Sequence, residues 1–119
     1  MNVINLKEKF NKFDEIYSPK IIAELNDYHV KLGKLLGDFV WHSHKETDEA
    51  FIIVEGSLEM HFRDKIEILN EGEMIVVPKG VEHKPYAKDL CKVLLIEPNT
   101  TVNTGDSENE MTKKNLGWI

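Results

Sequence analysis

Short apolar runs separated by turn-forming residues make up most of the chain, and a helical repeat occurs only near its start. Leu6, Phe10 and Phe13 recur at i, i+4 and i+7, which predicts a short helix over residues 6–13 that Ser18-Pro19 brings to an end. Farther along, the pattern predicts strands over residues 21–25, 28–36, 39–44, 49–55, 58–63, 66–69, 74–77 and 91–97.

Turn signals fall between these runs. Gly56-Ser57 and Asp64-Lys65 are typical of hairpin turns, and Asn70-Glu71-Gly72 and Pro78-Lys79-Gly80 are further breaks. Many short strands at this spacing predict an all-β sandwich or barrel. The pattern contains no helices long enough to connect parallel strands, which argues against a parallel α/β sheet.

The end of the chain differs from the rest. Residues 99–115 are polar, a composition that also fits a disordered tail. The chain nevertheless closes on Leu116, Gly117, Trp118 and Ile119, and a free tail seldom needs large apolar side chains. We therefore expect residues 99–119 to form a C-terminal extension that lies over the barrel or over a partner subunit.

Composition is typical of a globular protein. The chain has 119 residues, of which 41% are hydrophobic and 30% charged, and this fits one domain over residues 1–119 with a barrel core at about 28–98. A net charge of −6 without a basic stripe argues against nucleic acid and anionic membranes as partners. The N-terminus lacks a long apolar segment, so we expect a cytoplasmic protein. The single cysteine, Cys91, excludes a disulfide within the chain and is predicted to be a buried small hydrophobe.

Four residues form a candidate metal site: His42, His44, Glu49 and His83. His42 and His44 lie two apart on a predicted strand, so both imidazoles should point to one face of the sheet. Glu49 begins the next predicted strand, and pairing of the two strands would place its carboxylate beside the histidines. His83 follows a Pro-x-Gly turn that can aim it inward from across the barrel.

The donor set indicates which ions suit such a site. Three imidazole nitrogens and one carboxylate oxygen favour one divalent transition metal, with Fe, Mn, Ni, Co, Cu and Zn all open, whereas Ca and Mg prefer oxygen ligands. Four protein ligands on a six-coordinate ion would leave two positions for water, substrate or dioxygen. The alternative is structural: a His-x-His pair arises by chance, Glu49 can be a solvated strand end, and His83 can be a surface histidine.

Glycines around these residues strengthen the metal interpretation. The chain reads Gly37, four residues, His42-x-His44, four residues, Glu49, six residues, Gly56, and later Gly72, five residues, Pro78-x-Gly80, two residues, His83. This pattern resembles the two motifs of the cupin superfamily, the double-stranded β-helix proteins. It departs from them in two places, because the leading glycine stands one residue closer and Ala87 replaces a closing asparagine that is not a metal ligand in the family.

The resemblance implies a cupin-type double-stranded β-helix barrel with a short N-terminal helix, in which the four candidate residues hold one divalent transition metal. It also implies a metal-dependent enzyme acting on a small oxygen-bearing molecule, with isomerase, lyase and dioxygenase chemistry all open because cupins differ widely in reaction. Small cupins are often described as similar to mannose-6-phosphate isomerases, but this chain shows no convincing phosphate-binding cluster. The alternative is a non-catalytic small-molecule binding or sensing module with a metal-stabilised barrel. Exposed edge strands, and the frequent dimers of small cupins, predict a homodimer.

Other polar residues are weaker candidates. His29 and His61 alternate with apolar neighbours and are predicted to be exposed strand residues rather than ligands. Arg63 and Lys84 could contact an anionic substrate, although a solvated position is the simpler expectation for each. Tyr86 lies three residues beyond a candidate ligand and is a candidate proton donor.

Overall fold

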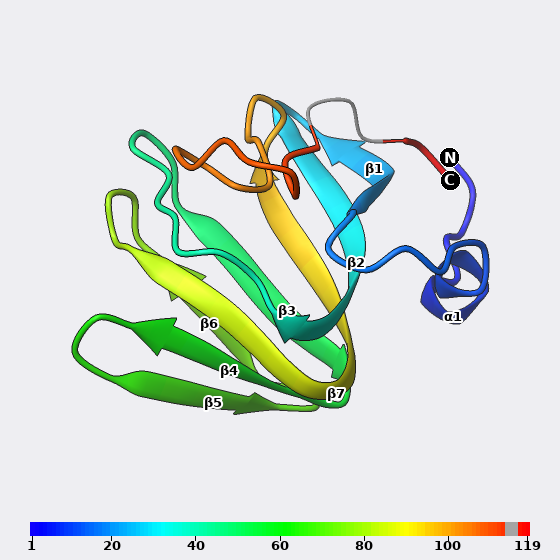
Figure 1. The fold of residues 1–119 in the computed structure, drawn as a ribbon. Coiled ribbons are helices and arrows are strands. Elements are labelled where there is room, and N and C mark those ends of the chain that lie inside the picture. Colours follow the sequence, from blue (N-terminus) through cyan, green and yellow to red (C-terminus); the bar gives the residue numbers. More distant parts are fainter. Residues whose placement is uncertain (114–116) are drawn as a thin grey trace.

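Within residues 1–113 and 117–119, which the computed structural model describes, seven antiparallel strands wrap into one curved sheet around an apolar interior (Figure 1). In chain order the elements are α1 (Leu6–Phe10), β1 (Lys20–Leu25), β2 (Tyr28–Asp38), β3 (Glu49–Glu55), β4 (Ser57–Phe62), β5 (Ile66–Asn70), β6 (Met74–Val77) and β7 (His83–Pro98). The strand order is β1-β2-β7-β3-β6, and β4 pairs with both β7 and β5. The all-β fold with a short N-terminal helix is therefore confirmed.

Strand β7 is the element to which most of the sheet attaches. It pairs with β2 along most of its length, with β3 through its second half and with β4 through its first four residues. The sequence predicted only residues 91–97 of this strand, because Pro85 has no backbone N–H to donate and so weakens the strand signal. The longer strand begins at His83, and it delivers that side chain, fully buried, to the barrel interior.

The prediction of a strand over residues 39–44 is wrong. This segment is a loop that touches the sheet through an isolated bridge between His42 and His83. The N–H of His42 donates to the carbonyl of His83 at 3.0 Å, and the N–H of His83 donates back at 2.9 Å. The N–H of Ser43 donates instead to the carboxylate of Asp106, so no continuous ladder forms. The bridge brings His42 beside His83, and two further backbone hydrogen bonds, from Phe39 to Pro85 and from Gly80 to His44, hold the same loop.

Helix α1 is shorter than the predicted span of residues 6–13. Its start is capped by Asn5, whose side-chain oxygen accepts a hydrogen bond from the N–H of Glu8 at 2.9 Å. Phe13 lies beyond the helix but still packs against Phe10, with ring centroids 6.1 Å apart, in a small apolar cluster with side chains of β1 and β2. The apolar spacing therefore identified correctly which side chains pack together, but it predicted the end of the helix incorrectly. No described helix is long and apolar enough to cross a membrane.

The main apolar core fills the inside of the barrel. Along β3, Glu49, Phe51 and Ile53 are buried and the residues between them are less so, which confirms that these three share the inner face. The buried members of the core are Tyr17, Leu35, Phe39, Phe51, Ile53, Leu58, Met60, Leu69, Val77, Ala87, Cys91, Val93 and Leu95. Cys91 is thus a buried small hydrophobe, as predicted. Glu49 stands out as a carboxylate on an otherwise apolar face.

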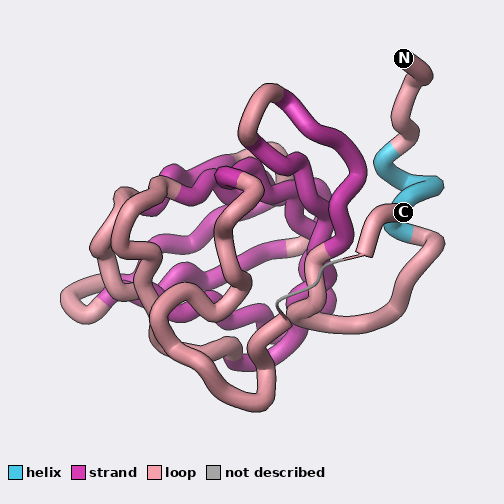
Figure 2. The backbone as a smooth tube through the Cα atoms, turned by 90° about the horizontal axis from the view of Figure 1, so that it is seen from above, coloured by secondary structure: helices cyan, strands magenta, loops and turns pink. Residues whose placement is uncertain are grey.

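The C-terminal extension lies over the barrel, one of its two expected places (Figure 1). Thr104 is fully buried within it, and Asn103 donates a side-chain hydrogen bond to the carbonyl of Tyr17 at 3.3 Å. The last residues run beside β1, where the N–H of Ile119 donates to the carbonyl of Ile21 at 3.1 Å and the N–H of Ile21 donates to that of Gly117 at 2.8 Å. Figure 2 shows both termini on the same side of the barrel, near α1. Leu116, named in the same expectation, lies outside the described residues.

Two turn glycines make a matched test of the backbone geometry. Gly56 has a φ of +90°, and an added Cβ would lie 2.9 Å from the carbonyl oxygen of Leu90, whereas Gly72 has a φ of +83° and open space around it. We predict that Gly72→Ala lowers the free energy of unfolding by about 1 kcal/mol through backbone strain alone. Gly56→Ala should cost at least about 1 kcal/mol more, because the backbone at Leu90 must also shift. Urea denaturation measures both variants, and equal losses would contradict the close contact at Gly56.

Candidate metal centre

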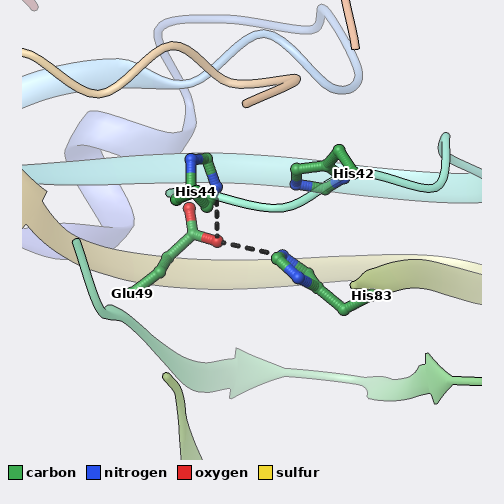
Figure 3. A group of neighbouring side chains, drawn as sticks. All are labelled: His42, His44, Glu49 and His83. Atoms are coloured by element: carbon green, nitrogen blue, oxygen red, sulfur yellow. Dashed lines mark ion pairs between the residues drawn. The ribbon is translucent and has the colours of Figure 1, made fainter. Parts of the chain in front are cut away.

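Four buried side chains converge at one place inside the barrel (Figure 3). Each of His42, His44, Glu49 and His83 offers one donor atom, and these atoms all lie within 4.8 Å of one another. Glu49 is the first residue of β3 and His83 the first of β7, while the other two histidines come from the loop between β2 and β3. The structure therefore brings together all four residues that the sequence singled out.

The carboxylate of Glu49 is central to the group. Its Oε1 lies 3.3 Å from Nε2 of His44 and 3.4 Å from Nε2 of His83. In Figure 3 both dashed contacts meet at this oxygen, and no dashed line reaches the ring of His42. The rings of His42 and His83 are close, with centroids 4.2 Å apart.

Backbone carbonyls set the orientation of two imidazoles. Nδ1 of His42 lies 2.9 Å from the carbonyl oxygen of Val40, and Nδ1 of His83 lies 2.9 Å from that of Val81. Because a carbonyl oxygen only accepts hydrogen bonds, each Nδ1 must carry the proton in the neutral ring. The lone pair is then on Nε2. A hydrogen bond from the other ring nitrogen to a carbonyl is a common way to orient a metal-binding histidine.

Three of the converging atoms lack a hydrogen-bond partner. Nε2 of His44, Nε2 of His83 and Oε1 of Glu49 are buried and make no hydrogen bond to any described residue. A buried polar atom left unpaired costs about 1–3 kcal/mol, so three in one place need an explanation. A divalent cation would satisfy all three at once, and the residues present therefore fit a metal ion.

The protonation states also match a metal site. Burial, helped by the nearby charge of His83, lowers the pKa of His42 to about 4, so this imidazole is neutral at neutral pH. Burial alone would raise the pKa of Glu49, but its contacts with Glu97 and the two adjoining histidines outweigh burial and hold that pKa well below its ordinary range. Neutral imidazole and ionised carboxylate are the forms that bind metals.

A buried ion pair behind Glu49 was missed by the sequence reasoning. Nζ of Lys31 lies 2.8 Å from Oε1 of Glu97, and both side chains are almost completely buried. Burial, together with the neighbouring charge of Glu49, raises the pKa of Glu97 well above its ordinary range. Strand alternation could have found Glu97, because it shares the inner face of β7 with Val93. Lys31 carries no such signal, since β2 is buried on both faces there.

The C-terminal extension holds the loop that carries two of the histidines. The carboxylate of Asp106 accepts hydrogen bonds from the N–H of Ser43 at 2.9 Å and from its hydroxyl at 3.1 Å, and the N–H of Asp106 donates to the carbonyl of Ser43 at 3.0 Å. The backbone bond from Ser43 lowers the pKa of Asp106. Gly105 packs so closely that an added Cβ would lie only 2.2 Å from the carbonyl oxygen of Ser43. Sequence reasoning left the role of this segment open.

The weaker histidine candidates lie outside the group. His29 contacts Glu24 at 3.3 Å and His61 contacts Glu59 at 3.0 Å. Their side chains are 13% and 23% exposed, so the prediction that both are exposed is wrong, because each packs against an aromatic ring as well as a carboxylate. Neither belongs to the four-residue cluster.

The remaining candidates also face away from the cluster. Tyr86 alternates with the buried residues Pro85 and Ala87 on β7, so it points to the opposite face from His83, and the structure gives no support for a proton donor there.

Arg63 and Lys84 are engaged at the surface. The guanidinium of Arg63 lies 3.8 Å from the ring centroid of Trp41 and 3.2 Å from Glu82, and Lys84 lies 2.9 Å from Asp38. Each cation therefore already has an anionic neighbour outside the cluster.

Comparison with known proteins agrees with this fold. Residues 30–97 match the family model described as Cupin domain, and the chain belongs to the cupin family. A cupin-2 domain containing protein from Shewanella frigidimarina is 56% identical, and its crystal structure superposes with a TM-score of 0.81 over 82% of this chain and 95% of that one. Protein NMB1881 from Neisseria meningitidis is 38% identical, with a TM-score of 0.76 over 82% and 100% of the two chains. The uncharacterized protein YdbB of Bacillus subtilis is 36% identical over 81 residues, which are 67% of this chain and 72% of its own length.

The contact between Asp106 and Ser43 predicts a positioning effect on the metal centre. Asp106→Ala should weaken the affinity for Co²⁺ or Zn²⁺ roughly tenfold, because residues that orient a ligand typically contribute about 10- to 100-fold to metal affinity. Glu110→Ala, at an exposed position of the same extension, should leave the affinity unchanged. Competition with a chromophoric chelator measures both variants. Equal affinity of Asp106→Ala and wild type would contradict a positioning role.

Proposed function

We propose that this cupin is a metal-dependent enzyme that acts on a small oxygen-bearing molecule. Its ligands are His42, His44, Glu49 and His83, and its reaction is of the isomerase, lyase or dioxygenase type. The observation that carries the proposal is the convergence of four buried donor atoms, three of them without a hydrogen-bond partner among the described residues.

The donor set limits the metal without naming it. Three imidazoles and one carboxylate suit Fe, Mn, Ni, Co, Cu and Zn, and affinity tends to follow the Irving–Williams order whatever the native ion is. A divalent ion held by these four residues would supply Lewis-acid or dioxygen chemistry. The chain's own part is to orient the ligands through Val40, Val81 and Asp106.

A cavity beside the donor atoms supports an active site over a purely structural metal. His42 and Glu49 both line this cavity, so the centre borders a space that another molecule can enter. A structural metal site is typically closed on all sides by protein ligands. The alternative of a non-catalytic binding or sensing module uses the same cavity, and turnover of a bound molecule separates the two. The cytoplasmic location expected from the sequence stays a prediction.

Metal analysis tests the proposal directly. Protein purified without a nickel column should carry a divalent transition metal, and His42→Ala should lose most of it because one of four ligands is gone. His29→Ala is the matched control, since His29 lies outside the cluster and contacts Glu24. Circular dichroism checks that both variants fold. Equal metal content in His42→Ala and wild type would show that the ion binds elsewhere.

We also propose that the homodimer expected from the sequence forms through β5 and β6. Both are edge strands, and Ile66, Ile68, Met74 and Val76 are each more than half exposed on them. Unpaired edges with apolar side chains tend to be covered in native proteins.

Light scattering after size exclusion tests this interface. Wild type should elute as a dimer, and Ile68→Lys should dissociate it. Leu25→Lys on β1 should leave the dimer intact, although Leu25 and Ile68 are equally exposed, at 63%. A wild-type monomer of 13.8 kDa would contradict the dimer, and dissociation by Leu25→Lys alone would place the interface on β1.

A further inference from the structure

The cavity beside the metal centre is small and has mostly apolar walls. Leu35, Phe39, Phe51, Val93 and Leu95 line it, and it leaves about 30 Å³ for the centres of water-sized molecules. A single water needs about 10–15 Å³ by this measure, so the space admits only a few non-hydrogen atoms without side-chain movement. A large polar ligand such as a sugar is therefore a poor fit.

The lining of the cavity also restricts the charge that a ligand can carry. No lysine or arginine of the described chain lines the cavity. The polar groups at its edge are already engaged, because the hydroxyl of Tyr17 donates to the carbonyl of Gly37, and Nδ2 of Asn103 donates to the carbonyls of Tyr17 and Met111. A phosphate buried here would find no protein cation, and an unpaired buried charge is strongly unfavourable.

One polar atom of the cavity is free to contact a ligand. Glu97 lines the cavity together with His42 and Glu49, and its side chain is 2% exposed. Lys31 binds its Oε1, whereas Oε2 is buried and has no hydrogen-bond partner among the described residues. This unpaired oxygen lies next to the donor group, at the polar end of an otherwise apolar space.

We propose that the cavity takes a small, mainly apolar molecule that bears a carbonyl or hydroxyl oxygen and no phosphate, with its oxygen end between the metal centre and Oε2 of Glu97. The inference rests on the proposed function and narrows its substrate class. Under this inference Glu97 is a specificity residue that contacts the ligand directly, in addition to its contact with Glu49.

Cobalt-substituted protein gives a direct test, because ligand binding at an open position changes the visible absorption of Co²⁺. The probes are 3-hydroxybutan-2-one, which is small, neutral and apolar at both ends, and methyl phosphate, which has the same number of non-hydrogen atoms but carries the charge of a phosphate monoester. The hydroxyketone should change the spectrum in a saturable way, and the phosphate should require at least about tenfold higher concentration, equivalent to about 1.4 kcal/mol.

Two variants test the walls and Glu97. The double variant Lys31→Met, Glu97→Leu removes the polar contact without leaving a buried charge unpaired, and it should weaken hydroxyketone binding about tenfold while retaining Co²⁺. Val93→Phe should fill the cavity and abolish hydroxyketone binding, also with Co²⁺ retained. Unchanged binding in both variants would overturn the inference.

The outcomes separate the inference from the proposed function. A spectrum that responds to azide but not to the hydroxyketone, or that responds to the phosphate more readily, would overturn the ligand class and leave the metal centre intact. A spectrum unchanged even by azide would show a closed centre and overturn the inference. Failure of wild type to bind Co²⁺ at all would instead refute the proposed function, on which the inference depends.

Discussion

The carboxylate of Glu49 sits among imidazoles on the inner face of an apolar barrel, and much of the structure follows from what that placement requires. A buried carboxylate without a cation is costly, and here the buried cation of Lys31 is bound to Glu97 instead. Burial keeps His42 neutral, and His44 and His83 each point Nε2 at the carboxylate of Glu49. Such a cluster is unfavourable by itself and becomes favourable once a divalent cation joins it.

Several separate parts of the chain hold this cluster in place. β3 and β7 each contribute their first residue, so the strand ends aim Glu49 and His83 into the interior. The loop that carries His42 and His44 forms no continuous ladder and is held by a bridge to β7, by single backbone hydrogen bonds and by the contacts of Asp106 with Ser43. The C-terminal extension is therefore part of the centre's scaffold, although it contributes none of the four clustered donors.

Much of this arrangement could be predicted from the sequence, because strand alternation and turn glycines are local signals. Alternation placed Glu49, Phe51 and Ile53 on one inner face, and the Pro-x-Gly turn placed His83 at the start of an inward strand. The same rule failed for residues 39–44, where the N–H of Ser43 donates to Asp106, 63 residues farther along the chain, instead of to a neighbouring strand. Local patterns carry no information about such partners.

The buried ion pair shows a second limit of sequence reasoning. Glu97 follows the alternation of β7, but a charged residue at a strand end ordinarily marks the solvent side. Lys31 faces inward because β2 is covered on both sides, which only the assembled fold determines. Their pairing across β2 and β7 could be recognised only once the register of these strands was known.

The most direct test of the account is to locate the metal. Crystals of the metal-loaded protein, measured at the absorption edge of the bound ion, should show one anomalous peak enclosed by Nε2 of the three histidines and Oε1 of Glu49, at about 2.0–2.2 Å from each. The surrounding electron density should show water or another small ligand on the side of the ion that faces the cavity. A peak at any other position, or four donor atoms that stay unligated in protein that carries metal, would contradict the account.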